Sequence, residues 1–598
     1  MTLPPVLDLT TLSEGYRSGA FTPLDVIEEV IARIDAGADP AVWISCFPDE
    51  ALRAAARALG THPDPARPLW GIPCAIKDNI DVAGLPTTAA CPAFAHEPAA
   101  DAAVVARLKA AGALVVGKTN LDQFATGLNG TRSPYGAPRS VFDPAYISGG
   151  SSSGSAVAVA SGLVAFSLGT DTAGSGRVPA AFNNLVGVKP TRGLVSSTGL
   201  VPACRSLDCI TVFAATAGDV AAVLAVMRGY DPRDPFSRVP ERRPLPLVGF
   251  RFGVLAAAER EFFGDRATEA LYDAAIARLA GLGGTAVEID YAPFRESADL
   301  LYGGPWIAER LAAVADFHAA HAAEMDPTVE KIIAGATDHT AVDAFRGLYR
   351  LEGLRQKTLA EWAKVDLLLL PTAATIHTVE AMRADPIALN STLGRYTNFV
   401  NLLDCAAIAV PAGFRPDGLP AGVTLIGPAF TDEALAVLGD RLHRALGAGP
   451  GVDRHGTLPG TPLAPDAEGL VAIGVVGAHL TGMPLNGQLT SVGGVLLKAT
   501  RTAPDYRMFV LPDTIPAKPG MIRDPGFVGP GLEIEVWGLP PAAASAFVAA
   551  IPAPLGIGKV RLADGTEVSA FLCEAHAVAG ATEITRGGSW RVHVAGGR

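Results

Sequence analysis

Charged side chains are scarce in this chain. Asp, Glu, Lys and Arg make up 18% of its 598 residues, against a usual ~25%, while 49% are hydrophobic. Such a composition excludes a long disordered protein. The length exceeds the ~250 to 300 residues at which a single core stops growing, so we expect two or more domains. The net charge of -12 disfavours nucleic acid and anionic membranes as partners, so an anionic substrate would need a local cationic site.

Cysteine is also sparse, and long apolar runs are lacking. The seven cysteines are odd in number and contain no C-x-x-C pair, which argues against a disulfide framework and against a zinc site. Residues 1–5 lack the basic and apolar regions of a signal peptide. Residues 147–170 carry no charge but are crowded with Ser and Gly, unlike the ~20 apolar residues of a membrane span. We expect a cytoplasmic protein that needs no metal.

Helical and strand patterns alternate through the first three quarters of the chain. Thr22, Pro23 and Asp25 form a helix start ahead of apolar residues at helical spacing. We further predict a helix over 102–111, a short buried strand over 113–116 and a helix over 156–163. This alternation favours an α/β architecture with a mixed sheet inside.

A Gly- and Pro-rich segment, residues 447–469, follows a predicted helix over 432–446 and is the best candidate for a linker. It separates a catalytic domain over 1–450 from a smaller α+β domain over 470–598. In the second domain we predict a helix over 541–551 and short strands over 470–476, 493–499, 506–511, 532–537, 559–562 and 590–594.

Two serine-containing segments and an upstream lysine offer the groups that nucleophilic catalysis by a serine would need. Gly149 to Ser155 is a Ser/Gly run, Asp171 to Arg177 holds a second serine, Ser175, and Lys77 lies upstream of both. A serine hydroxyl must lose its proton to a base as it attacks a carbonyl. Lysine can be that base only if its pKa falls from ~10.4 by about three units, which costs about 4 kcal/mol.

This combination resembles the amidase signature family, whose hydrolases cleave amides with a Ser, cis-Ser, Lys triad. Further matches in the family's order, such as 117–120, 189–193 and 418–420, extend the resemblance over residues 20 to 445. It implies an amidase signature fold, a mixed central sheet covered by helices, no cofactor and a homodimer. It also implies that Lys77 deprotonates Ser151, that Ser151 relays the proton from Ser175, and that the bond entering Ser151 is cis. Ser175 would form the acyl-enzyme, and an oxyanion hole would consist of backbone N–H groups at Thr172, Ala173, Gly174 and Ser175.

Two other motifs compete with this interpretation. Residues 150–154 satisfy G-x-S-x-G, the nucleophile elbow of α/β-hydrolases, which would make Ser152 the nucleophile. Residues 112–119 satisfy the P-loop pattern of nucleotide-binding proteins. The first follows a loop signal where the elbow requires a strand. The variable positions of the second, residues 113–116, are all apolar and predict a strand instead of a flexible loop. Both are therefore disfavoured.

Residues 301–310 narrow the range of possible substrates. Within the family they resemble the segment that marks allophanate hydrolases, and the resemblance implies that Tyr302 and Arg310 bind the substrate's carboxylate. A guanidinium donates two hydrogen bonds to a carboxylate and a phenol adds a third. The alternative is that Arg310 is a solvated helix residue paired with Glu309 or Asp316.

The tail is similar to the C-terminal domain of longer allophanate hydrolases, in which a histidine of this segment is tied to decarboxylation of the first product. His479 is the matching residue, and a histidine can transfer a proton near neutral pH. His576 and His593 are weaker candidates, and a structural role for His479 stays open.

The resemblance implies hydrolysis of allophanate to ammonia and N-carboxycarbamate, followed by loss of carbon dioxide, in urea degradation beside a separate urea carboxylase. A general amidase, an amidotransferase subunit of the same family and an inactive scaffold with a C-terminal interaction domain remain alternatives.

Overall fold

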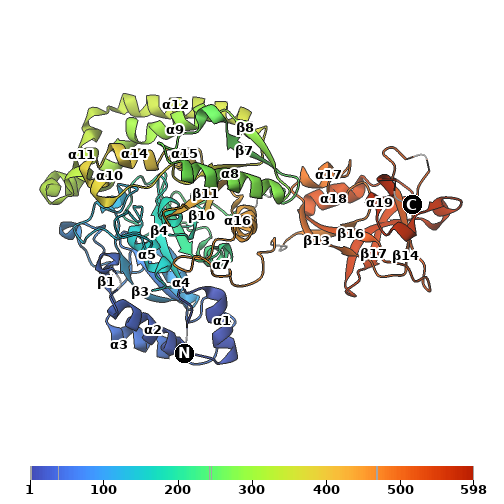
Figure 1. The fold of residues 1–598 in the computed structure, drawn as a ribbon, viewed down its shortest axis with the longest axis horizontal. Coiled ribbons are helices and arrows are strands. Elements are labelled where there is room, and N and C mark those ends of the chain that lie inside the picture. The colour runs from blue at the N-terminus through green and yellow to red at the C-terminus, as the bar shows by residue number, and fades with distance from the viewer. Residues whose placement is uncertain are drawn as a thin grey trace. The chain divides into compact units, whose positions relative to one another are not determined.

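The computed structural model describes residues 3–37, 39–241, 243, 245–465, 469–512 and 514–596. Figure 1 shows the course of the chain. The chain divides into two compact units, the first Met1–Arg242 with Arg251–Leu463 and the second Arg243–Phe250 with Ala464–Arg598. Residues 466–468 of the expected linker lie outside the described residues.

The first unit is built on one mixed sheet. Its strand order is β1 (Trp43–Cys46), β3 (Leu114–Thr119), β2 (Pro73–Lys77), β4 (Phe166–Asp171), β6 (Cys209–Ala214), β5 (Val186–Lys189), β10 (Cys405–Phe414), β11 (Pro420–Pro428), β9 (Leu367–Pro371), β7 (Arg251–Leu255) and β8 (Thr285–Ile289). β2 runs parallel to β3 and β4, whereas β4 and β6 are antiparallel. The predicted α/β class with a mixed sheet is confirmed.

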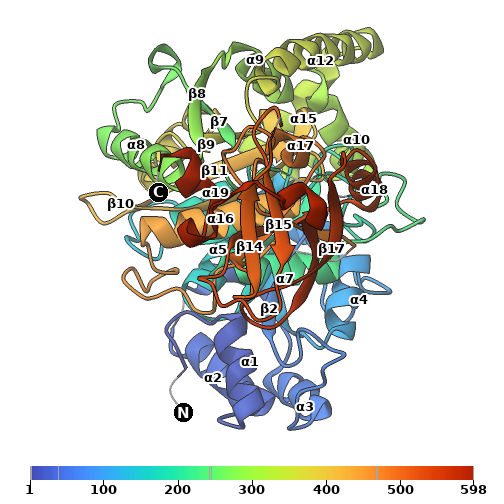
Figure 2. The same ribbon diagram turned by 90° about the vertical axis from the view of Figure 1, so that its right-hand side faces the viewer.

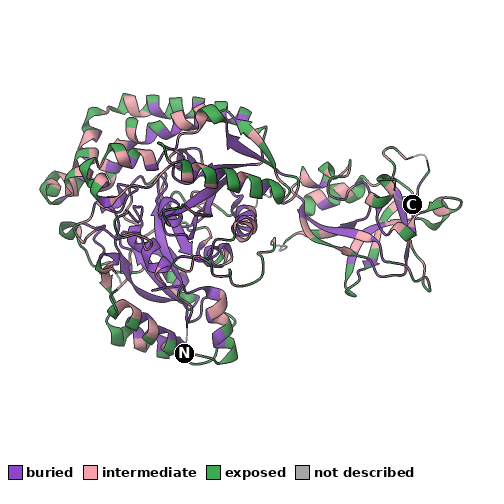
Figure 3. Ribbon diagram, in the orientation of Figure 1, coloured by how far each residue is buried: buried purple, intermediate pink, exposed green. Residues whose placement is uncertain are grey.

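Helices surround this sheet (Figure 1). They are α1 (Leu9–Ser18), α2 (Pro23–Asp35), α3 (Asp49–Leu59), α4 (Ala103–Ala110), α5 (Ser153–Ala160), α6 (Val178–Phe182), α7 (Ala217–Met227), α8 (Arg266–Gly281), α9 (Ala292–Gly303), α10 (Trp306–His321), α11 (Pro327–Ala334), α12 (Ala341–Trp362), α13 (Val379–Ala384), α14 (Ala388–Leu393), α15 (Phe399–Leu402) and α16 (Asp432–Leu446). Every residue of β2, β3, β4 and α5 is buried, and Figure 3 shows that buried residues fill the centre of the unit.

Local sequence explains the helices that were predicted. Thr22 and Asp25 form a capping box at the start of α2, with each side chain bound to the other's backbone N–H. The helices predicted over 102–111 and 432–446 are confirmed as α4 and α16. The helix predicted over 156–163 is α5, which begins three residues earlier, at Ser153.

The first half of the expected linker is fixed to the first unit. Asn184 donates to the carbonyl of Gly451 at 3.1 Å, and Arg444 donates to the carbonyl of Pro459 at 3.1 Å. Leu463 N–H donates to Asp440 at 2.8 Å. Segment 447–463 is therefore bound along the surface of this unit.

The second unit has two small sheets, and Figure 2 shows some of their strands. One has the order β13 (Val495–Arg501), β16 (Glu533–Leu539), β12 (Val471–Val475), β18 (Glu567–Cys573) and β17 (Leu555–Arg561), and the other β15 (Pro519–Arg523), β14 (Tyr506–Val510) and β19 (Thr582–Glu583). Its helices are α17 (Gly487–Thr490), α18 (Pro541–Ala549) and α19 (Trp590–Val594).

One prediction in this unit was wrong. Residues 590–594 were expected as a strand but form helix α19, because Ser589 caps the helix by accepting from the backbone N–H of Arg591 at 3.1 Å. Strands β15, β18 and β19 were not predicted. Alternating apolar residues in a segment this short fit either structure, and here the cap decided it.

Within the described residues, no helix is long and apolar enough to cross a membrane. The same part of the chain contains no group of three or more His, Cys, Asp or Glu side chains arranged to hold a metal ion.

Candidate active site

Two of the expected triad residues, Lys77 and Ser175, lie at or just after the ends of neighbouring strands. β2 ends at Lys77 and its parallel neighbour β4 ends at Asp171, so the segments after both strands emerge at one edge of the sheet. Ser151 lies in the loop before α5, and Ser175 lies in the loop after β4. Carboxyl ends of parallel strands are a frequent location of sites in α/β proteins.

Lys77 is buried and hydrogen-bonded to neutral groups. Its Nζ donates to Ser151 Oγ at 2.8 Å and to Thr170 Oγ1 at 2.7 Å. Burial lowers the pKa of Lys77 to about 7, because the charged amine loses its hydration, while the carboxylates of Asp122, Asp208 and Asp171 act in the opposite direction. The amine can therefore exchange a proton near neutral pH.

The Gly150–Ser151 peptide bond is cis, as the resemblance implied. Ser151 O accepts from the backbone N–H of Asp122 at 3.1 Å, which fixes the loop against the segment after β3. A Cβ at Gly150 would lie 2.2 Å from Asp122 Oδ2, so only glycine fits there.

Ser175 is also buried, with its Oγ 3.4 Å from the carbonyl oxygen of Gly127. Among the described residues no hydrogen bond joins Ser175 to Ser151. Of the two hydrogen bonds that the expected relay needs, the described residues form the one between Lys77 and Ser151 but not the one between Ser151 and Ser175. Catalytic hydrogen bonds are often incomplete without substrate.

A buried ion pair holds the loop that carries Ser175. Arg177 donates from Nε and Nη2 to the two carboxylate oxygens of Asp171, each at 2.9 Å, and the backbone N–H of Gly176 donates to Asp171 at 3.0 Å. Burial alone would raise the pKa of Asp171, but the adjacent guanidinium outweighs it and the pKa is lowered. Asp171 therefore stays ionised and keeps the segment 172–175 in place.

Sequence reasoning missed Asp122. Its carboxylate accepts from the backbone N–H groups of Asn129 at 3.2 Å, Gly130 at 3.0 Å and Arg132 at 3.1 Å, and so shapes the loop that faces Ser175. A signal was available, because Asp122 is the only charged residue in the stretch 119–131. Such a residue in an uncharged, buried run needs internal partners.

The residues of both competing motifs, the nucleophile elbow and the P-loop, make hydrogen bonds within the fold. Ser152 Oγ donates to the carbonyl of Thr170 at 3.1 Å and accepts from its N–H at 3.2 Å, so this hydroxyl is engaged by β4. Residues 114–119 form strand β3, and the buried Lys118 donates to Thr87 Oγ1 at 2.9 Å beside Asp78. No flexible loop is present there to surround a phosphate.

Tyr302 and Arg310 meet, although they lie on different helices, α9 and α10. Arg310 is only 2% exposed and donates to Tyr302 OH at 3.2 Å and to Thr126 Oγ1 at 3.0 Å. Its Nε has no hydrogen-bond partner, and no ion pair of Arg310 occurs in the described part of the chain. The alternative of a solvated Arg310 paired with Glu309 or Asp316 is therefore wrong.

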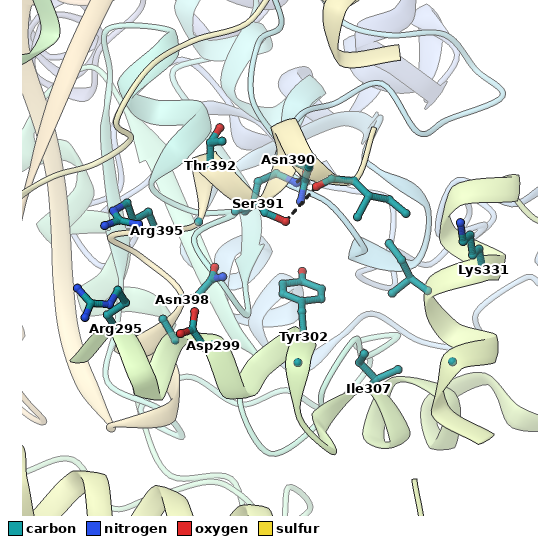
Figure 4. A pocket seen from close by; sticks show the side chains of 18 of the residues that line it. Arg295, Asp299, Tyr302, Ile307, Lys331, Asn390, Ser391, Thr392, Arg395 and Asn398 are labelled. Atoms are coloured by element: carbon teal, nitrogen blue, oxygen red, sulfur yellow. Dashed lines mark hydrogen bonds between the residues drawn. The ribbon is translucent and has the colours of Figure 1, made fainter. Parts of the chain in front are cut away.

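Tyr302 also lines a cavity of about 720 Å³, shown in Figure 4. The cavity is bordered by Leu128 of the loop facing Ser175, and by Asn390, whose side-chain oxygen accepts from the backbone N–H of Leu128 at 2.8 Å. Its lining is rich in cations and includes Arg132, Arg295, Lys331, Arg395 and one acid, Asp299. The local charge is thus opposite to that of the chain as a whole.

His479 belongs to the second unit. It follows β12, packs on Phe571 with ring centroids 5.4 Å apart, and its Nε2 is 2.9 Å from Gln488 Oε1. Burial lowers its pKa. It lines a largely apolar cavity of about 570 Å³ together with Lys518. His576 lies outside that lining, 3.2 Å from Glu574, and His593 packs on Trp590.

Comparison with known proteins gives two family matches. The amidase family matches residues 25–436, and the allophanate hydrolase C-terminal domain matches residues 471–595. Among curated relatives, the urea amidolyases of Lachancea kluyveri and Saccharomyces cerevisiae are 45% and 43% identical over 93% and 92% of this chain. The chain spans only 31% of the length of each of these relatives.

A solved structure of comparable length is the Kluyveromyces lactis allophanate hydrolase, with 41% identity, a TM-score of 0.81 and coverage of 96% of this chain and 97% of that one. A glutamyl-tRNA(Gln) amidotransferase subunit from Synechococcus is 36% identical, over 71% of this chain and 94% of its own length. The chain therefore belongs to the amidase family.

Proposed function

We propose that this chain hydrolyses allophanate at its terminal amide, releasing ammonia and N-carboxycarbamate. The observation that carries this proposal is Arg310, a buried guanidinium with an unpartnered Nε beside Tyr302. A buried charge that makes no ion pair in contact is costly, so the site is completed by a small anion. The K. lactis allophanate hydrolase, similar in fold over nearly the whole chain, supports allophanate as that anion.

In this mechanism neutral Lys77 accepts the Ser151 proton, Ser151 accepts the Ser175 proton, and Ser175 Oγ attacks the terminal carbonyl. Backbone N–H groups of Thr172, Ala173, Gly174 and Ser175 stabilise the oxyanion. The C–N bond then breaks, and ammonia leaves with a proton returned along the same relay. Water hydrolyses the resulting acyl-enzyme by the same route and regenerates Ser175.

The second unit acts on the first product. Its cavity places His479 and the ammonium group of Lys518 among apolar side chains. We assign His479 to proton transfer during decarboxylation of N-carboxycarbamate, with Lys518 binding a carboxylate. Apolar surroundings favour loss of carbon dioxide, because they stabilise the dispersed charge of the transition state better than the localised carboxylate.

The resemblance to urea amidolyases supports a place in urea degradation, beside a urea carboxylase that supplies allophanate. Cytoplasmic location and a homodimer belong to the same proposal. A general amidase or an amidotransferase subunit would have no need of the Arg310–Tyr302 pair, and an inactive scaffold would have no need of a buried Lys77–Ser151 link.

Ser175→Ala should abolish ammonia release from allophanate and labelling by a fluorophosphonate, because it removes the attacking oxygen. Ser152→Ala removes a hydroxyl that only bonds β4, so it should retain a measurable fraction of both activities. Mass spectrometry of the labelled serine is the measurement. A folded, inactive Ser152→Ala beside an active Ser175→Ala would assign the nucleophile to Ser152.

Lys77 sets the expected pH dependence. Its pKa is lowered to about 7, so kcat should rise with pH through a midpoint near this value and fall below it as the amine becomes charged. Lys77→Arg, which cannot deprotonate in this range, should be as inactive as Lys77→Ala. Initial rates of ammonia release between pH 5 and 9, with enzyme stability checked at each pH, test this. A Lys77→Arg enzyme with near-normal turnover would exclude the relay.

Arg310→Ala should lower kcat/KM for allophanate by about 10- to 150-fold, since a charge-assisted hydrogen bond contributes roughly 1.5 to 3 kcal/mol. Uncharged propionamide, a poorer substrate, should be hardly affected. Arg266→Ala, a change at an exposed arginine, serves as the control. Equal losses on both substrates would show that Arg310 only stabilises the fold.

The proposed role of the second unit is tested by comparing the times at which ammonia and carbon dioxide are released. His479→Ala and Lys518→Met should release the first ammonia normally and release carbon dioxide only at the spontaneous rate. Lys559→Met, at an exposed lysine of the same unit, is the matched control. A chain ending at Pro465, beyond the segment bound to the first unit, should behave like His479→Ala. Rapid-mixing measurement of ammonia and carbon dioxide release from each variant tests this prediction. If all variants match the intact enzyme, the unit has no role in decarboxylation.

A further inference from the structure

Asp208 connects two parts of the candidate site that no motif links. It directly precedes β6, whose first residue, Cys209, pairs with Asp171 at the end of β4. Its carboxylate accepts from the side-chain hydroxyl of Thr172, and also from the backbone N–H groups of Ala203 at 2.8 Å and Cys204 at 3.3 Å. Asp208 therefore ties the loop 203–208 to the first residue of the segment 172–175.

The same loop is bound to helix α10, which carries Arg310. Ser206 donates from its backbone N–H and its hydroxyl to the two carboxylate oxygens of Glu309, at 2.7 and 2.8 Å. Cys204 Sγ donates to the carbonyl of Trp306 at 3.6 Å. Glu309 is the neighbour of Arg310 in sequence. The loop thus spans the distance between the carboxylate-binding arginine and the backbone donors beside Ser175.

Asp208 also interacts electrostatically with Lys77 and Arg310. Burial raises its pKa to about 6, while its hydrogen bonds and Arg310 of α10 act in the opposite direction, so it is mainly ionised at neutral pH. Its negative charge raises the pKa of Lys77 on β2. Arg205, Arg233 and Asp234 line a cavity of about 300 Å³ with it. Asp208 contacts no atom of the Lys77, Ser151 and Ser175 side chains within hydrogen-bond distance among the described residues.

We infer that Asp208 is a positioning residue for the amide hydrolysis, fixing the segment 172–175 at a set distance from the Arg310–Tyr302 pair. The substrate's carboxylate and its reacting carbonyl are separated by a short, rigid skeleton. Both must be bound at once for the oxyanion to reach its donors. A displacement of about 1 Å between the two can cost on the order of 100-fold in rate. This inference rests on the proposed function.

The test compares Asp208→Asn with Thr172→Val in the full-length protein. Both weaken the bond between the loop and the segment 172–175, so each should lower kcat for allophanate by about tenfold or more. Only Asp208→Asn removes a negative charge near Lys77, so only this variant should move the acid limb of the pH–rate profile to lower pH. Asp234→Asn, at a carboxylate that lines the same cavity but binds Ser197, is the control and should change neither quantity.

Thermal unfolding of each variant identifies loss of the fold, and Thr172→Val keeps the inference testable if Asp208→Asn does not fold. A folded Asp208→Asn or Thr172→Val with kcat within twofold of the parent would overturn the positioning role. A shift of the acid limb without a loss of kcat would also overturn it, because charge alone would then explain the effect. Fluorophosphonate labelling of Ser175 is measured in parallel. If the parent labels but does not cleave allophanate, the proposed substrate fails rather than the role of Asp208.

Discussion

The burial of the Lys77 amine at the end of a β-strand is the constraint on which the candidate site of the first unit depends. Lys77 closes a fully buried strand, and hydroxyl groups are the partners of its Nζ. Desolvation lowers its pKa to about 7, which is the property that serine activation requires. The surrounding sheet must stay dry for this to hold, and the full burial of β2, β4 and α5 meets that condition.

Fixed charges around this amine are arranged to hold loops rather than to neutralise it. Asp171 is paired with Arg177, and Asp122 is occupied by backbone N–H groups. Each carboxylate therefore holds a loop of the candidate site in place. Its hydrogen-bond donors offset part of its negative charge, which weakens its effect on the pKa of Lys77. The cavity that Tyr302 lines has four cationic side chains and one acidic side chain in its lining, in a protein of net charge -12.

Much of this could be predicted from local sequence. Helix α2 follows from its capping box, and the Lys77, Ser151 and Ser175 set follows from motifs whose glycines have steric reasons, as at Gly150. Asp122, Thr170 and Asp208 could not be assigned in the same way. Asp122 binds backbone N–H groups of the loop that follows it, whereas Thr170 and Asp208 bind side chains on other segments, and no periodic pattern records such contacts. Helix α19 was mistaken for a strand because a short apolar segment fits both.

The sequence by itself determined the α/β class, the family and the candidates for the reacting groups, because those depend on composition, local capping and short motifs. The tertiary structure decided which side chains share a dielectric environment. Only folding buries Lys77 enough to lower its pKa, leaves Arg310 Nε without a hydrogen-bond partner, and places Asp208 between Thr172 and the loop bound to α10. Desolvation and charge pairing depend on three-dimensional distance, and a linear sequence does not specify that distance.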